Sequence, residues 1–395
     1  MADEGRWVAD RCPQCGGILS ESGREIECPF CGSHLVRRAP AGPGESPAEA
    51  KSFVEGLLHL KTYSCVDDEG IGCEAFSLLI PHSWEAEGGV RWPLQNPGMP
   101  AVVALRAHQP GGEPAFEVLP SLPFYWSNNP MVTMQFPMGS SYFGNEVRPP
   151  VQALQAMREI VVPRYRGQIP GLQIVSSGHV SGFVSRQQAP NPIFGGGPVQ
   201  DGAKVRIRYR QGSAESEEDL FCKVEITHSV APSMMGMIEN TFWNADLIFA
   251  FRAPVGQLDP LSDLFYALVR SIRLNRQWFN RYTQLTQYLT QNPMQQIHHI
   301  GQIRQLLSQT NDYMDPMVAD VFNQRQAMID GIASGFSQAR RGVDTYADPY
   351  SGEMLELPGG YDNVWASDTQ EYILTNDAAF DPNREFDATW QRLSR

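Results

Sequence analysis

The chain lacks any apolar run close to the ~20 residues that a membrane-spanning helix needs, so we expect no membrane span. It begins Met-Ala-Asp-Glu-Gly-Arg-Trp, which is acidic and has no apolar core, and this predicts no secretory signal. Basic residues are outnumbered: 31 Lys and Arg stand against 44 Asp and Glu, for a net charge of −13. Such a chain repels nucleic acid unless a local basic surface overrides its field. We therefore expect a cytoplasmic protein whose partners are not nucleic acids.

Motifs of the common enzyme classes are missing as well. The sequence has no HExxH motif, and its eight histidines include no pair four residues apart with a flanking Glu. Ser181 lies in Gly-His-Val-Ser-Gly, which lacks the Gly-x-Ser-x-Gly elbow of a serine hydrolase. Gly195–Gly197 lacks the Lys-Ser/Thr of a phosphate-binding loop. The sequence thus names no catalytic residue, although an enzyme or enzyme subunit with its site in residues 50–275 stays open as an alternative.

Cysteine, in contrast, carries a clear pattern. Four of the seven cysteines form two Cys-Pro-x-Cys-Gly units, at Cys12 and Cys15 and at Cys28 and Cys31. Two such turns can point four sulfur atoms at one ion, and a closed tetrahedral shell of four Cys ligands is the structural form of a Zn²⁺ site. The spacing therefore predicts one structural zinc ion. Because a closed shell leaves no position for water, we expect no catalysis there.

These paired units resemble the rubredoxin-like knuckles of the zinc-ribbon family, and the resemblance covers residues 10–36. It implies a small module braced by its metal. Two alternatives stay open. One is an iron centre, which needs an apolar shell and is disfavoured by the polar side chains of Arg11, Glu21 and Arg24. The other is a ribbon that associates with nucleic acid. Basic and acidic side chains balance around the ribbon, which gives phosphates no net attraction.

The other three cysteines, Cys65, Cys73 and Cys222, follow no framework spacing. Thiols stay reduced in the cytosol, so we interpret all three as free and place Cys222 in the core of a strand. A disulfide between Cys65 and Cys73 is the alternative.

Composition divides the chain into five segments. We expect, in chain order, a zinc ribbon, a Pro- and Gly-rich linker, an α+β domain, a polar helical segment, and an acidic tail with an aromatic-rich β-hairpin. The boundaries are 1–38, 39–49, 50–275, 276–343 and 344–395. The predicted fold class is α+β, with an antiparallel sheet and packed helices in the central domain.

Apolar and alternating runs define that central domain. Strands are expected at Phe76–Ile80, Ala101–Arg106, Phe116–Leu119, Leu172–Val175, Gly178–Val184, Lys204–Arg210, Leu220–Thr227 and Trp243–Phe251. Helices are expected over Pro150–Ile160 and from Asp259 to Ile272. The order of elements, carried by Phe76–Trp84, Ile248–Arg252 and Leu264–Leu274, resembles the PsbP-like fold. That resemblance implies a helix-covered sheet in a protein that binds ligands or partners.

Charge alternates along Lys204–Arg210, and the acidic run Glu215–Asp219 follows soon after. We interpret the basic residues as the solvent-exposed side of an edge strand, where charge also discourages pairing with other chains. A nucleic-acid surface is the alternative.

Three helices are expected in the helical segment, at 276–291, 293–310 and 316–341, with Asn292 and Asp315 as caps before prolines. Narrow apolar stripes run along these polar helices, and the stripe from Val318 to Ile332 includes Arg325. Such stripes suit packing against a neighbour in the chain or in a second copy. We therefore expect a protein partner or self-association through 276–395. Taken together, the sequence predicts a non-enzymatic, zinc-binding scaffold or adaptor that acts through protein–protein contacts.

Overall fold

Contacts group the chain into two compact units in the computed structural model. The larger unit holds His59–Gly335 together with Thr369–Glu371, and the smaller unit holds Met1–Leu58, Phe336–Asp368 and Tyr372–Arg395. The structure describes residues 25–27, 34–36, 56–93, 95–180, 199–211, 214–233, 236–292, 302, 306, 313–336 and 342–394.

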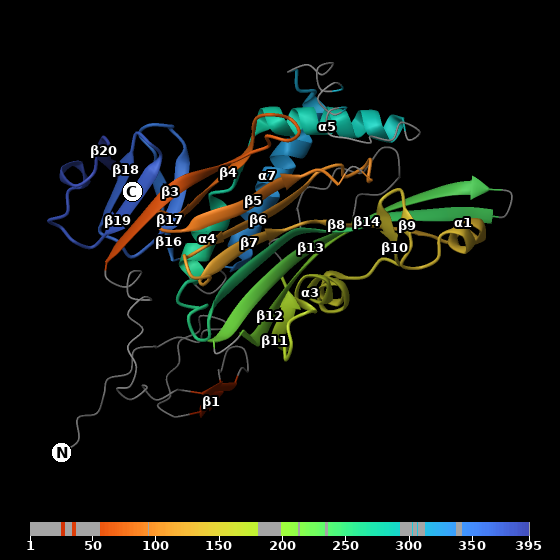
Figure 1. The fold of residues 1–395 in the computed structure, drawn as a ribbon, viewed down its shortest axis with the longest axis horizontal. Helices are drawn as coiled ribbons and strands as arrows, with labels where there is room; N and C mark the ends of the chain where they lie inside the picture. Colours follow the sequence, from red (N-terminus) through yellow and green to blue (C-terminus); the bar gives the residue numbers. More distant parts are fainter. Residues whose placement is uncertain are drawn as a thin grey trace. The chain divides into compact units, whose positions relative to one another are not determined.

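A curled sheet forms the main part of the larger unit (Figure 1). Its strands follow the order β11 (Gln173–His179), β12 (Val199–Gln211), β13 (Ala214–Ser233), β14 (Gly236–Pro254), β7 (Ala115–Leu119), β6 (Val102–His108) and β5 (Glu85–Arg91). Three further strands extend the sheet from β14. β8 (Leu122–Ser127) pairs with β14, β10 (Asn145–Val147) pairs with β8, and β9 (Ser141–Tyr142) pairs with β10. The hairpin of β13 and β14 is long, at 20 and 19 residues, so β14 pairs with β7 along one half and with β8 along the other.

A helical stretch covers one face of this sheet. α2 (Ala153–Ala156), the π-helical turn η2 (Met157–Val161) and α3 (Val162–Arg166) follow one another without a break. Met157 packs with Leu220 and Cys222 of β13 in a cluster of fully buried side chains. The helix expected over Pro150–Ile160 therefore exists, but it begins later, and Val151 precedes it as a half-buried residue.

Phenylalanine rings fill the opposite face. Phe116 of β7 stacks on Phe251 of β14 with ring centroids 5.3 Å apart, and Phe251 contacts Phe265 of α4 (Ser262–Arg270) at 4.8 Å. Offset ring pairs of this kind contribute beyond their buried area. The helix predicted from Asp259 onward is confirmed, with its first turn at Ser262.

Shorter strands complete the two units. In the larger unit, β15 (Arg273–Leu274), β4 (Glu74–Pro81) and β3 (Leu57–Val66) pair in that order. In the smaller unit, β18 (Asn363–Ser367) pairs with β19 (Glu371–Thr375) and β20 (Trp390–Arg392), which confirms the predicted aromatic-rich hairpin. The smaller unit also contains the hairpin β16 (Val343–Ala347) and β17 (Met354–Pro358) and the short helix η4 (Pro382–Arg384).

Two of the three predicted polar helices are confirmed. α5 (Arg276–Gln291) begins after Asn275, whose side chain accepts the backbone N–H groups of the first turn. α7 (Pro316–Phe336) begins after Asp315, whose carboxylate accepts the Met317 N–H at 2.8 Å as expected. The helix predicted at 293–310 lies outside the described residues, apart from two helical positions. Within the described part of the chain, no helix combines the length and the apolar character that a membrane crossing needs.

The predicted α+β class is wrong. Strands make up 45% of the structure and helices 23%, so the fold is mainly β. The strands predicted at Phe76–Ile80 and Ala101–Arg106 belong to different sheets, since β4 pairs with β3 and β6 pairs with β5 and β7. Alternation of apolar and polar residues identifies a strand but not the sheet to which it belongs. It also misses the half of the β13–β14 hairpin that lies near the turn, where apolar and polar residues follow no period of two.

The edge-strand interpretation of Lys204–Arg210 is also wrong. β12 lies between β11 and β13, and its basic side chains pair with the acidic run on β13. The ion pairs are Lys204–Asp219, Arg206–Asp219, Arg208–Glu217 and Arg210–Glu215. Opposite charges on facing strands stabilise a sheet, which explains why the two charged runs follow each other in sequence.

A buried group of charged side chains joins Arg166 of α3 to the sheet. Arg166 binds Glu218 through Nε at 2.9 Å and Glu117 through Nη2 at 2.7 Å, and the Tyr209 hydroxyl donates to Glu218 at 3.1 Å. Glu218 is fully buried. A buried carboxylate is tolerated only with such partners.

Arg166→Met should therefore lower the free energy of unfolding by about 3–5 kcal/mol, because it leaves the buried Glu218 without its cation. Arg210→Met is the matched control: Arg210 is 66% exposed and pairs with Glu215 on the surface, so the loss should stay below about 1 kcal/mol. Urea unfolding followed by tryptophan fluorescence measures both. Equal losses in the two variants would contradict the assignment.

Candidate functional site

A cavity of about 410 Å³ lies in the larger unit. Its walls come from β4, β6, β7 and β14 and from helices α5 and α7. Most of the lining is apolar and includes Val118, Phe249, Trp278, Phe279 and Ile329. Concave, mainly apolar spaces of this size with a few polar groups are typical of small-molecule sites.

A β-bulge in β14 brings polar groups to this wall. The register between β13 and β14 shifts between Phe221 and Lys223, and Leu247 has a positive φ of 49°, which is uncommon for a residue other than glycine. Successive residues of a regular strand point to opposite faces. Because of the bulge, both Asp246 and Leu247 line the cavity.

Asp246 forms a two-bond ion pair with Arg325 of α7. Nη1 donates to one carboxylate oxygen at 2.7 Å and Nη2 to the other at 3.2 Å, and the Ser121 hydroxyl adds a third hydrogen bond. Burial pushes the pKa of the Asp246 carboxyl up, but Arg325 and Ser121 outweigh burial and hold that pKa below its ordinary value. The pair is therefore charged at neutral pH in an otherwise apolar wall.

Asn244 and Tyr282 are among the further polar residues that line the cavity. The Oδ1 atom of Asn244 is buried, and it has no hydrogen-bond partner among the residues that the structure describes. Burial raises the pKa of Tyr282 to about 12, so its phenol keeps the proton at neutral pH. A buried acceptor left unpaired costs about 1–3 kcal/mol. The cavity thus offers the Tyr282 phenol as a donor, whereas the Oδ1 atom of Asn244 is enclosed by its neighbours and does not face the open space.

A second buried carboxylate, Asp67, fixes the start of α5. It accepts hydrogen bonds from the indole N–H of Trp278 at 2.8 Å, from that of Trp92 at 2.9 Å, and from the backbone N–H groups of Gly70 and Ile71. Gly70 is required here, because a Cβ at this position would lie 2.3 Å from the Trp92 ring. Since Trp278 lines the cavity, Asp67 holds one of its walls in place.

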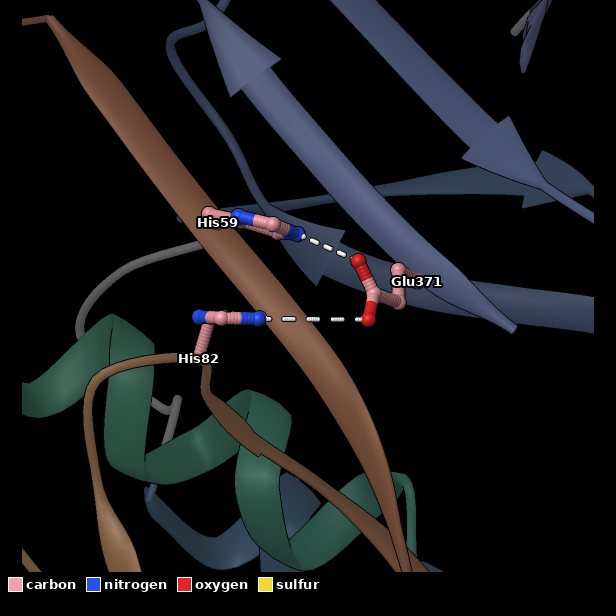
Figure 2. Close-up of side chains that lie close together, drawn as sticks. All are labelled: His59, His82 and Glu371. Atoms are coloured by element: carbon pink, nitrogen blue, oxygen red, sulfur yellow. Dashed lines mark hydrogen bonds and ion pairs between the residues drawn. The ribbon is translucent and has the colours of Figure 1, made fainter. Parts of the chain in front are cut away.

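A group of two histidines and a glutamate lies outside the cavity lining (Figure 2). His59 on β3 and His82 after β4 are cross-strand neighbours, and their rings stack with centroids 4.3 Å apart. The Glu371 carboxylate lies 2.8 Å from His59 Nε2 and 4.0 Å from His82 Nε2. Burial lowers the pKa of His59, and the hydrogen bond to Glu371 opposes this effect.

The residues predicted as zinc ligands, Cys12, Cys15, Cys28 and Cys31, lie outside the described residues. The zinc site and the zinc-ribbon resemblance therefore stay predictions. The nearest described elements are β1 (Glu25–Glu27) and β2 (His34–Val36), which pair antiparallel.

The remaining cysteines are free thiols, as interpreted from the sequence, so no disulfide joins Cys65 and Cys73. Cys222 is fully buried on β13, which confirms its placement in a strand core. Burial raises the pKa of the Cys65 thiol to about 11, which leaves it protonated and poorly reactive at neutral pH.

Arg325 is a signal for the cavity within the sequence itself. Arg325 interrupts the apolar stripe from Val318 to Ile332, and a charge in such a stripe implies a buried partner. No comparable signal exists for His59 and Glu371, which are 312 residues apart.

No protein-family model matches this chain, and a comparison with curated proteins gives no match.

Asp246→Asn should lower the free energy of unfolding by about 1–3 kcal/mol at neutral pH, because it removes the partner of Arg325. The loss is smaller than for a fully buried pair, since 36% of the Arg325 side chain is accessible. The folded-state pKa of Asp246 lies below the unfolded value of about 3.9, so its contribution is complete above that pH and is lost as the pH falls through the folded-state pKa.

Urea unfolding of both proteins from about pH 7 to about pH 3 measures this difference. It should be constant near neutrality and shrink in acid. A difference that grows on acidification would contradict the role given to the pair.

Proposed function

We propose that the larger unit binds a small, mainly apolar molecule in the cavity between the sheet and helices α5 and α7. One observation carries this proposal: a space of about 410 Å³ is lined mainly by apolar side chains and carries few polar groups, the protonated phenol of Tyr282 among them.

Charge on the cavity wall narrows the class of ligand. Asp246 and Arg325 neutralise each other through two hydrogen bonds, so the wall gives little net attraction to an anion or a cation. The protonated phenol of Tyr282 can donate to a carbonyl or hydroxyl oxygen. The best fit is a neutral molecule with an apolar body and one hydroxyl, amide or similar group.

Binding fits the titration behaviour of these groups better than acid–base catalysis does. A general acid or base works best with a pKa near the operating pH. The pKa of Asp246 is held low and that of Tyr282 is raised to about 12, so neither group exchanges protons readily near neutrality. The enzyme alternative is for this reason less well supported than a binding role.

Val321→Trp should weaken ligand binding, because Val321 lines the cavity and is 47% exposed, which places it at the rim. A neutral dye with one N–H group, N-phenyl-naphthylamine, serves as the probe. We expect at least about tenfold weaker binding, or ~1.4 kcal/mol, in a fluorescence titration of the full chain.

Met317→Trp is the matched control for that titration. Met317 lies one helical turn earlier on α7, is 70% exposed and is not part of the lining, so binding should be unchanged. Equal dye affinity in wild type and Val321→Trp would overturn the proposal.

For the N-terminal segment we keep the proposal of one structural zinc ion bound by Cys12, Cys15, Cys28 and Cys31. Four Cys at this spacing are the support for it. Purified protein, dialysed against a weak chelator, should retain zinc, and the double variant Cys12→Ser, Cys28→Ser should lose one ion per chain by elemental analysis. Equal zinc content in the two proteins would contradict it.

The scaffold role predicted from sequence is the second candidate function. It is supported by exposed apolar side chains on and near α1 (Pro130–Gln135) and at the far end of the β13–β14 hairpin, namely Met131, Met134, Met138, Phe143, Met237 and Phe242. Methionine and aromatic side chains are enriched in protein interfaces. Deleting 276–395 would not test this role cleanly, because α5 and α7 form walls of the cavity.

A further inference from the structure

The grouping of His59, His82 and Glu371 has the composition of a metal site. Each residue offers one ligand atom, and these atoms all lie within 4.8 Å of one another. Two imidazole nitrogens with one carboxylate oxygen form the ligand set of many sites for Zn²⁺ and related transition metals. Mg²⁺ and Ca²⁺ prefer oxygen ligands and do not suit this set.

Distances within the group are close to those that a metal ion requires. Ligand atoms about 2.0–2.2 Å from a tetrahedral ion lie roughly 3.3–3.6 Å from one another. Glu371 is 2.8 Å from His59 and 4.0 Å from His82, which brackets that range. Side-chain rotation can bring both distances into this range, and the His82 side chain, 52% exposed, has room for it.

The backbone holds the three side chains together without a metal. The His82 N–H donates to the His59 carbonyl at 2.8 Å, which fixes the two histidines as neighbours on adjacent strands. Glu371 follows Gln370, whose carbonyl accepts from both the backbone N–H and the hydroxyl of Thr62. Figure 2 shows both Nε2 atoms pointing at the same carboxylate.

The two imidazole rings are nearly parallel, since their planes differ by 16° at a centroid distance of 4.3 Å. In this arrangement the in-plane lone pairs of the two Nε2 atoms run side by side, so one ring must turn before both nitrogens can bind the same ion. His82 can make this turn while His59 stays in place, because the His82 side chain is 52% exposed and that of His59 only 13%.

We infer that His59, His82 and Glu371 bind one divalent transition metal ion, with water completing its coordination. This site is independent of the ligand cavity and of the zinc predicted at the four cysteines, from which it differs by lacking sulfur.

Calorimetric titration of the full chain with Zn²⁺, after dialysis against a weak chelator, tests the inference. Wild type should bind one ion at this site. His82→Ala and Glu371→Gln should bind it at least about tenfold more weakly, since even the loss of a residue that only orients a metal ligand lowers metal affinity about 10–100-fold. The His82 side chain is 52% exposed, so His82→Ala should keep the wild-type melting temperature.

His228→Ala is the matched control. His228 also faces a glutamate, Glu239 at 3.0 Å, and is 42% exposed, but it is not part of a metal-capable group among the described residues. It should bind the ion as wild type does. Co²⁺ serves as a spectroscopic probe of the same site. Co²⁺ bound by His59, His82 and Glu371 should give visible bands without thiolate charge transfer. His82→Ala should lose these bands, and the double variant Cys12→Ser, Cys28→Ser should retain them.

The inference is overturned if wild type, His82→Ala and Glu371→Gln bind the same number of ions with the same affinity. It is also overturned if Cys12→Ser, Cys28→Ser abolishes all binding of Zn²⁺ and Co²⁺.

Discussion

The ion pair between Asp246 and Arg325 is the interaction on which the candidate site depends. It joins β14 of the sheet to α7 by two hydrogen bonds, and it does so at the wall of an apolar cavity. Charges lose hydration when they are buried, and apolar residues of similar shape are often as stable. The pair therefore contributes orientation more than stability: it fixes α7 over the cavity while it adds almost no net charge to the wall.

A second carboxylate does for α5 what Asp246 does for α7. Asp67 accepts four N–H groups, two of them from tryptophans, and one of these, Trp278, belongs to α5 and lines the cavity. A buried carboxylate thus holds each helix against a different part of the larger unit. The β-bulge at Leu247 places Asp246 on the cavity wall between the two helices and the sheet. A cavity formed in this way exists before a ligand arrives, which lowers the entropy cost of binding.

Sequence reasoning identifies most individual elements here but not their assembly. Periodicity places α4, and the cap Asp315 places the start of α7, because these signals are local. The cap of α5, Asn275, is not identified from the sequence. Sheet membership, the π turn at Met157–Val161 and the bulge at Leu247 depend on contacts between distant residues, and no local pattern encodes them. The same holds for the site. A charged residue such as Arg325 within an apolar helix stripe indicates a buried partner, whereas His59 and Glu371 come together only through folding.

A ligand-accessible, mainly apolar cavity between the sheet and the two helices is the feature on which the binding role depends. A crystal of the full chain pressurised with xenon measures it directly, because xenon enters dry apolar cavities and scatters strongly. The account predicts a xenon atom in contact with Val118, Phe249 and Ile329, which line the apolar part of the wall. A space filled by side chains or by ordered water, without xenon, would contradict it.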